Sequence, residues 1–248
     1  MTEVPVPGPV PRYELERWRE LGLVAGVTAR GNRELPFDLG LRGSSTPVGI
    51  VMDNWLALLE SQSAFQAIVV SRQIHGTEIR WQRVGGTRGI IVQAGVDGHA
   101  TDLPGVLLAV TVADCVPVYL ADPIRRVVAL LHAGWRGTGA GILGRAIALL
   151  LGTGSRVENL LVHCGVGICG QCYEVGPEVF AACGVPGPVG EKQGLDLRRV
   201  LRQQARDAGV VKISTSQFCS AHDAGLFFSH RGSRGADGRM VAYLGLLP

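Results

Sequence analysis

The chain has 248 residues, of which 46% are hydrophobic, and a formal net charge of +3 at pH 7. The hydrophobic fraction is enough to fill a sizeable core, which excludes a mainly disordered protein. Because the charge is small and the basic residues are dispersed, neither nucleic acid nor a membrane surface is indicated as a partner.

The N-terminal residues contain Pro5, Pro7, Pro9 and Pro11 but neither the basic nor the apolar part of a secretory signal. We predict a flexible lead-in over residues 1–12 and a single domain over residues 13–248. No apolar run reaches the roughly 18 residues of a membrane span. A cytoplasmic protein is therefore expected, in which the six cysteines are free thiols or ligands and not a disulfide framework.

Apolar periodicity predicts the elements of the first hundred residues. In chain order they are a short helix at 14–18, a strand at 23–28, a helix at 54–60 capped by Asp53, a strand at 67–70, an edge strand at 78–84, and a glycine-rich polar loop within 92–105 that faces a cleft.

Residues 107–137 form the centre of the chain. Two apolar runs rich in β-branched residues break off at polar clusters, the first at Asp114 and Cys115 and the second at His132. The Asp122-Pro123 pair between them favours a turn. We predict a buried hairpin that brings Cys115 and His132 to the same side of a sheet.

The remaining elements follow from the same patterns. They are an apolar helix at 138–151 whose glycine-rich start beside Arg136 suits an anion, a strand at 160–163, helices at 178–183 and 196–208, a strand at 210–215, and two terminal strands at 227–231 and 238–245.

His75, Cys115 and His132 each directly follow an apolar strand. Two imidazoles and a thiolate suit zinc and leave the fourth position of a catalytic site open, although copper accepts the same donors. The alternative is a buried structural cysteine and two histidines bonded to backbone. A nucleophilic pair of Cys115 and His132 is a further chemical option.

A second set of donors comprises His163, Cys164, Cys169 and Cys172, with one C-x-x-C spacing. Alone it resembles a structural zinc site or a redox pair. The alternative is a group of small buried thiols, because cysteine is often buried and the chain has no second C-x-x-C.

Arg72, Arg136 and Arg231 lie in glycine-bearing turns, where a guanidinium can bind phosphate or carboxylate through two hydrogen bonds. Solvated surface arginines are the alternative. Asp114, next to Cys115, is a candidate general base or ligand-orienting residue, or simply a strand-end cap.

Five segments in matching order resemble the laccase-domain family, whose members are described as polyphenol oxidases and purine nucleoside phosphorylases. They are Ser-Arg-Gln-Ile-His-Gly at 71–76, Ala-Val-Thr-Val-Ala-Asp-Cys-Val-Pro-Val at 109–118, His-Ala-Gly-Trp-Arg-Gly at 132–137, Cys-Tyr-Glu-Val-Gly at 172–176, and Phe-Ser-His-Arg at 228–231 with Gly-Arg at 238–239. The resemblance implies an α+β fold, a single-domain α/β/β/α-type sandwich with mixed sheets, and zinc or copper held by His75, Cys115 and His132.

The resemblance also implies phosphorolysis of adenosine, inosine and methylthioadenosine, with adenosine deamination. Asp114, Cys115 and His132 are then the expected catalytic residues. Arg72, Gln73, Arg136 and Arg231 are expected to bind nucleoside or phosphate. Copper-dependent phenol oxidation, hydrolysis of peptidoglycan precursors, and a binding protein with a structural metal are the alternatives.

Overall fold

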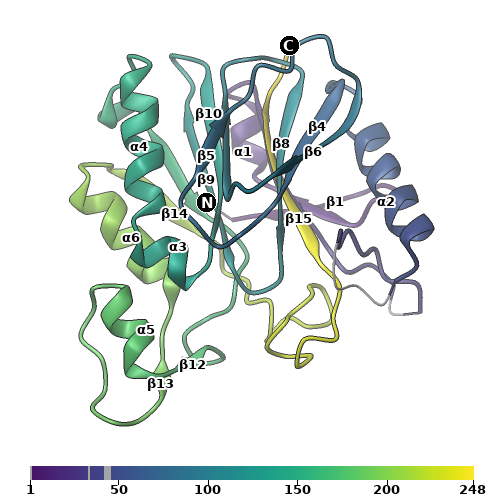
Figure 1. The fold of residues 1–248 in the computed structure, drawn as a ribbon. Helices are drawn as coiled ribbons and strands as arrows, with labels where there is room; N and C mark the ends of the chain where they lie inside the picture. The colour runs from purple at the N-terminus through teal and green to yellow at the C-terminus, as the bar shows by residue number, and fades with distance from the viewer. Residues whose placement is uncertain (1, 33, 42–45) are drawn as a thin grey trace.

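The computed structural model describes residues 2–32, 34–41 and 46–248. Two large mixed sheets pack face to face, and helices cover both outer faces (Figure 1). This arrangement confirms the α/β/β/α sandwich of mixed sheets that the family resemblance implies.

The first sheet has seven strands in the order β1-β2-β3-β15-β8-β4-β6. β4 runs parallel to both β6 and β8, and the other neighbours are antiparallel. The strands are β1 Val4–Val6, β2 Arg12–Glu14, β3 Leu23–Thr28, β4 Ala67–Arg72, β6 Gly89–Ala94, β8 Val106–Val112 and β15 Met240–Leu246.

The second sheet has six strands in the order β14-β11-β9-β10-β7-β5, and β12 and β13 form a small separate pair. The strands are β5 Ile79–Trp81, β7 Gly98–Thr101, β9 Val116–Asp122, β10 Val127–Ala133, β11 Leu161–Cys164, β12 Glu174–Val175, β13 Gln193–Gly194 and β14 Lys212–Thr215.

Helices complete the outer layers. α2 covers the first sheet, whereas α3, α4 and α6 cover the second (Figure 1). The helices are α1 Glu16–Arg19, α2 Val48–Ser61, α3 Trp135–Gly139, α4 Ile142–Gly152, a 3-10 turn Val157–Asn159, α5 Pro177–Ala182 and α6 Leu197–Asp207. As predicted, Asp196 caps α6 by accepting the Arg198 N–H.

The central strands are apolar on both faces because both faces are covered. In β9, Val118 and Leu120 point into the core under α4 and α6. Tyr119 and Ala121 alternate with them and point into the core between the two sheets. The Tyr119 hydroxyl donates to the Gly26 carbonyl at 2.8 Å and so links the sheets.

The predicted hairpin is confirmed for β9 and β10, which pair antiparallel over their whole length. The apolar run that precedes it is not part of the hairpin. It forms β8 in the first sheet, and the chain crosses between the sheets through Asp114 and Cys115. An apolar run alone cannot show this, because strands buried on both faces look the same in either sheet.

Several predicted boundaries are wrong. The helix at 54–60 begins earlier, as α2 at Val48 after Pro47, so Asp53 lies within the helix and does not cap it. The fixed φ of proline suits this start. The helix at 138–151 is two helices, α3 and α4, because Gly141 adopts a φ of +81° between them.

The predicted loop within residues 92–105 and the predicted strand at 227–231 also differ from the structure. Residues 92–105 contribute strands β6 and β7, and the described polar residues Asp97 and His99 are fully buried. Residues 227–231 form no strand and instead run from a bend into a turn. Phe227 and Phe228 are buried in the core between the sheets, which explains their apolar character.

Part of the predicted flexible lead-in is a strand in the structure. Val4–Val6 forms β1 and pairs with β2. Glu3 is 4% exposed and its carboxylate lies 3.0 Å from Nε2 of the buried His163 on β11. The alternating prolines make this strand hard to predict from the sequence. Proline is tolerated here because the strand lies at the edge of the sheet.

Among the described residues, no helix combines the length and hydrophobicity that a membrane span requires.

We predict that Glu3→Gln destabilises the protein by about 1–3 kcal/mol at pH 7. Burial alone would raise the pKa of the Glu3 carboxyl, but the hydrogen bond and charge of His163 hold it below its ordinary value of 4.5. A lowered native pKa contributes stability above the unfolded pKa, and this is lost as the pH falls through the native value. The free energy of unfolding, measured with denaturant, should therefore differ most between wild-type protein and Glu3→Gln at pH 7. This difference should become smaller below pH 4.5.

The matched control is Glu60→Gln on the exposed face of α2, which should change the free energy of unfolding by less than about 0.5 kcal/mol. Equal effects from both substitutions would contradict the role of the Glu3–His163 pair.

Candidate active site

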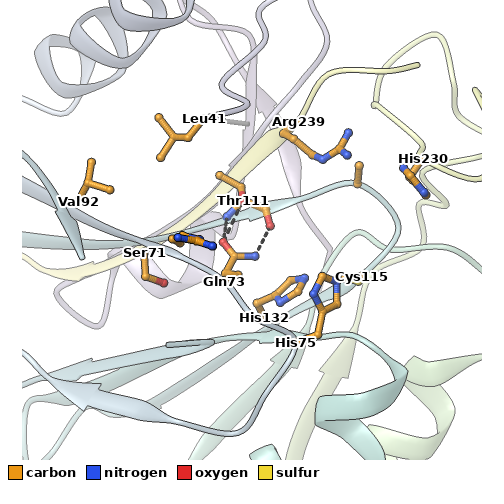
Figure 2. A pocket seen from close by; sticks show the side chains of 12 residues that line it. Leu41, Ser71, Gln73, His75, Val92, Thr111, Cys115, His132, His230 and Arg239 are labelled. Carbon is orange, nitrogen blue, oxygen red and sulfur yellow. Dashed lines mark hydrogen bonds between the residues drawn. The ribbon is translucent and has the colours of Figure 1, made fainter. Parts of the chain in front are cut away.

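Three donor side chains from both sheets and from the crossover between them lie close together (Figure 2). His75 follows β4 of the first sheet, Cys115 lies in the crossover between β8 and β9, and His132 is near the end of β10. One ligand atom from each lies within 4.8 Å of the others. The structure thus brings together the three residues that the sequence analysis grouped as metal ligands.

The buried carboxylate of Asp97 orients two of these donors. Its Oδ1 accepts the backbone N–H of His75 at 2.9 Å and lies 2.9 Å from Nδ1 of His132. Its Oδ2 accepts the N–H groups of Ile74 and Gly76 at 3.1 and 2.7 Å. With Nδ1 donating to Asp97, Nε2 of His132 is the nitrogen that can act as a ligand, the arrangement usual for metal-binding histidines.

Local backbone geometry allows the close approach. His75 adopts a φ of +60°, in the left-handed region, and the hydrogen bonds of this turn to Asp97 hold it there. A side chain at Gly134 would place its Cβ 3.0 Å from Sγ of Cys115 and 3.2 Å from Cδ2 of His75. Glycine at this position therefore makes room for the donors.

The donors form a charged pair without a metal. Burial alone would raise the pKa of the Cys115 thiol, but His132 and His75 lower it to about 6. Burial disfavours the imidazolium of His132, but the Cys115 thiolate and Asp97 raise its pKa to about 9. A thiolate is the form of cysteine that binds metal, and two imidazoles complete a donor set that fits zinc.

The donors lie on one wall of a cavity of about 640 Å³. Arg72, Gln73, Arg239 and His230 also line it, together with apolar side chains such as Leu41. Figure 2 shows Arg239 and His230 reaching the cavity from the C-terminal part of the chain. The cavity therefore combines a three-donor cluster with positively charged guanidinium groups.

Gln73, predicted to bind substrate, lines the cavity but its amide is engaged by β8. Its Oε1 accepts both the N–H and the hydroxyl of Thr111, at 2.8 and 2.9 Å, and its Nε2 donates to the Thr111 carbonyl at 2.8 Å. Gln73 therefore joins the turn after β4 to the end of β8, which fixes the cavity wall.

The structure does not bring Asp114 to the cavity. Its Oδ1 accepts the hydroxyls of Ser220 and Ser229 at 2.6 and 2.7 Å, and its Oδ2 accepts the backbone N–H of Arg231 at 2.6 Å. This fully engaged carboxylate holds the segment that carries His230. Its predicted role as a proton carrier therefore has no support from the geometry, whereas the alternative of an orienting residue does.

Two of the predicted phosphate-binding arginines also lie away from the cavity lining. Arg136 is exposed on α3, with its guanidinium 4.2 Å from the Trp135 ring centroid. Arg231 donates to the carbonyl of Glu174 at 2.8 Å, and its guanidinium lies 5.2 Å from the Tyr173 ring centroid. Arg72 is the predicted arginine that does line the cavity.

Sequence reasoning missed Asp97, His230 and Arg239 as parts of the site. The sequence predicts that Asp97 lies in a polar loop facing the cleft, whereas its side chain is 0% exposed. The Ser-His-Arg and Gly-Arg segments of the family resemblance contain His230 and Arg239, and this pattern could have identified both.

We predict that Asp97→Asn weakens zinc binding by roughly 10- to 100-fold, because the substitution removes the anionic partner that orients His132. Competition with a chelating dye measures the change. The control is Asp122→Asn, since Asp122 is equally buried but accepts the N–H groups of Ile124 and Arg125 in the β9–β10 turn, far from the donors. Equal zinc affinity in both variants would contradict the orienting role of Asp97.

We further predict that in metal-free protein Cys115 is alkylated by iodoacetamide with a rate that rises through about pH 6, because only the thiolate reacts. Cys183 serves as an internal control, since burial raises the pKa of its thiol. Peptide mass spectrometry distinguishes the two. A Cys115 rate that rises only above pH 8 would show that its charged form is not stabilised.

Comparisons with known proteins identify the family. Residues 37–247 match the family model described as multi-copper polyphenol oxidoreductase laccase. The chain is 34% identical to the purine nucleoside phosphorylase YlmD of Geobacillus stearothermophilus, over 90% of each chain. It is also 37% identical to the adenosine deaminase RL5 of an unknown prokaryotic organism, over 55% of this chain and 57% of that protein.

Solved structures show the same family relationship. The crystal structure of YlmD from Geobacillus stearothermophilus superposes with a TM-score of 0.87 at 30% identity, covering 99% of this chain and 100% of that one. Sequence and fold together show that the chain belongs to the laccase-like family whose curated relatives include YlmD-type purine nucleoside phosphorylases.

Proposed function

We propose that this protein is a zinc-dependent purine nucleoside phosphorylase that cleaves adenosine, inosine and methylthioadenosine with phosphate, and that the same site deaminates adenosine. The observation that carries the proposal is the joint presence, around one cavity, of the His75, Cys115 and His132 cluster and the guanidinium groups of Arg72 and Arg239. Relatives named purine nucleoside phosphorylase and adenosine deaminase support it.

The donor set fits zinc better than a multi-copper centre. His75, Cys115 and His132 supply three protein ligands and leave one position open, as catalytic zinc sites do. When bound there, zinc is a Lewis acid that polarises substrate oxygen and makes water more acidic. Among the described residues, this cavity offers one such donor cluster, which favours a single metal ion.

In the proposed reaction, Arg72 and Arg239 bind the co-substrate phosphate. Arg239 is fixed at the cavity because its Nη1 donates to the carbonyls of Asp237 and Gly238 at 2.7 and 2.8 Å. Arg72 lines the same space. Two guanidinium groups offset the charge of phosphate and orient it by paired hydrogen bonds, so that an oxygen can be directed at the ribose C1′.

The nucleoside fits the rest of the cavity. A volume of about 640 Å³ falls within the usual range of about 300–1,000 Å³ for small-molecule sites. Leu41 and Val92 provide apolar surface for a purine ring, while His230 offers an imidazole that can hydrogen-bond to base or sugar.

The test is phosphate-dependent release of free base from the three nucleosides, measured by liquid chromatography on protein of known zinc content. We predict base release only with phosphate in wild-type protein, and at least a 100-fold loss of kcat/KM in Cys115→Ala with its circular dichroism spectrum retained. Retained turnover, or loss of the fold, would contradict a catalytic metal site.

Arg239→Met tests the phosphate site separately. Loss of a charged hydrogen-bonding group should raise the KM for phosphate by roughly 10- to 100-fold. The control is Arg145→Met, an exposed arginine on α4, which should leave that KM unchanged. Phenol oxidation by copper-loaded protein, with no phosphate-dependent base release, would overturn the proposal in favour of an oxidase.

A further inference from the structure

The second set of sulfur donors is composed differently from the sequence prediction. His163 and Cys164 are both fully buried on β11, and His163 is engaged by Glu3 and by Ser214, whose Oγ lies 2.8 Å from Nδ1. Neither belongs to a metal-binding cluster in the described part of the chain. Cys169 and Cys172, by contrast, lie in a tight turn in which the Cys172 N–H donates to the Cys169 carbonyl at 3.1 Å.

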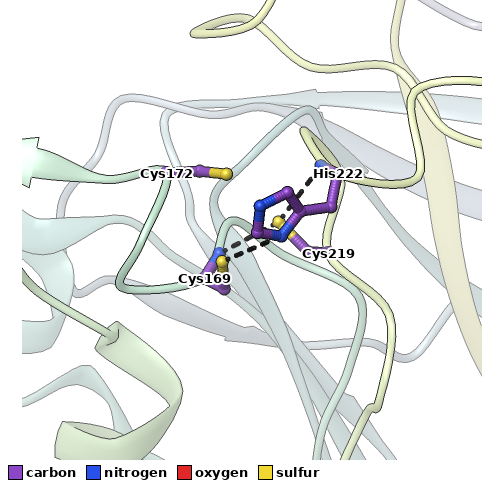
Figure 3. Close-up of side chains that lie close together, drawn as sticks. All are labelled: Cys169, Cys172, Cys219 and His222. Carbon is purple, nitrogen blue, oxygen red and sulfur yellow. Dashed lines mark hydrogen bonds between the residues drawn. The ribbon is translucent and has the colours of Figure 1, made fainter.

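The chain supplies two further donors to this turn from a distant segment. Cys219 and His222 lie beside Cys169 and Cys172, and one ligand atom from each of the four residues lies within 4.8 Å of the others (Figure 3). The second pair has the spacing C-x-x-H. It is the second half of a zinc-binding pattern that a search for a second C-x-x-C cannot find.

We propose that Cys169, Cys172, Cys219 and His222 bind a second zinc ion, whose role is structural. Three thiolates and one imidazole form a donor set that occurs in structural zinc sites and fills all four tetrahedral positions. The first cluster, with three protein donors, leaves a position for substrate. The two clusters therefore differ in donor number in the way that catalytic and structural zinc sites differ.

The backbone around the second cluster already supports charged sulfur. The N–H groups of Cys169 and His222 point to Sγ of Cys219 at 3.3 and 3.5 Å. Nδ1 of His222 lies 3.4 Å from Sγ of Cys169. Hydrogen bonds to ligand atoms are the usual outer support of metal sites.

Surrounding contacts fix both halves of the site. Arg198 donates from Nη1 to the carbonyl of Phe218 at 2.6 Å, just before Cys219. The N–H of Cys219 donates to Oδ2 of Asp223 at 2.8 Å. Cys219 also forms a single β-bridge with Gly167, two residues before Cys169. These contacts hold the two segments side by side, so that their four donor atoms are already close together.

The second cluster is connected to the cavity through Asp114. Ser220, next to Cys219, donates to the same Asp114 carboxylate that accepts Ser229 and the Arg231 N–H. A zinc ion at the second cluster would thus stabilise the segment that presents His230 to the cavity. Its removal should loosen that segment without removing any donor of the first site.

The test is the zinc content per chain of purified, extensively dialysed protein, measured by plasma mass spectrometry. Two zinc ions are expected in wild-type protein, one in Cys115→Ala, and one in both Cys219→Ser and His222→Ala. The matched control is Cys183→Ser, a buried cysteine outside both clusters, which should keep two. His222 is exposed, so its substitution tests the site even if Cys219→Ser fails to fold.

A second measurement isolates the site from the proposed function. In Cys115→Ala protein, which lacks a ligand of the first cluster, cobalt(II) should give an intense thiolate charge-transfer band that His222→Ala weakens, and chelation should lower Tm by several degrees. A zinc-free Cys115→Ala protein would overturn the proposal. So would a mass two hydrogens lower in native protein with Cys169 and Cys172 linked, which would identify a redox pair.

Discussion

The buried carboxylate of Asp97 is the group on which the site depends. It accepts three consecutive N–H groups of residues 74–76 and contacts Nδ1 of His132. The turn after β4 and the end of β10 belong to different sheets, so this one side chain sets their relative position. A desolvated anion of this kind is stable only while fully hydrogen-bonded, which makes the donor geometry rigid before any metal binds.

Asp114, next to Cys115 in the sequence, is a second carboxylate that joins distant segments by hydrogen bonds. Its hydrogen bonds to Ser220, Ser229 and the Arg231 N–H tie the sheet crossover to the segment that carries His230. The same segment contains Cys219 and His222 of the four-donor cluster. The three-donor cluster, the cavity wall and the proposed structural zinc site are therefore parts of one connected polar network at one end of the sandwich.

Much of this architecture follows from the sequence alone. The strand at 23–28, the β9–β10 hairpin, the capped α6 and the grouping of His75, Cys115 and His132 are all present. Apolar runs and turn residues carry that information locally. The features that the sequence does not show depend on distant partners. Asp97 lies in a bend between β6 and β7, but its burial and its four side-chain hydrogen bonds involve residues far away in the sequence. In the same way, β8 cannot be assigned to its sheet from its own residues.

The positions of the predicted phosphate-binding arginines and of the sulfur donors also depend on distant parts of the chain. Glycine-bearing turns near Arg136 and Arg231 resemble anion sites in sequence, but tertiary packing directs these side chains to Trp135 and Glu174 and brings Arg239 to the cavity instead. Cys219 lies 47 positions beyond Cys172, so only the fold shows that they meet. Local chemistry identifies which residues can act, and topology decides which act together.

Diffraction from crystals of the native protein at the zinc absorption edge tests the central claim most directly. The account predicts an anomalous peak between Nε2 of His132, an imidazole nitrogen of His75 and Sγ of Cys115, with Asp97 hydrogen-bonded to His132 and outside the coordination sphere. A zinc ion bound by the Asp97 carboxylate, or no peak among these three donors in zinc-containing crystals, would contradict it.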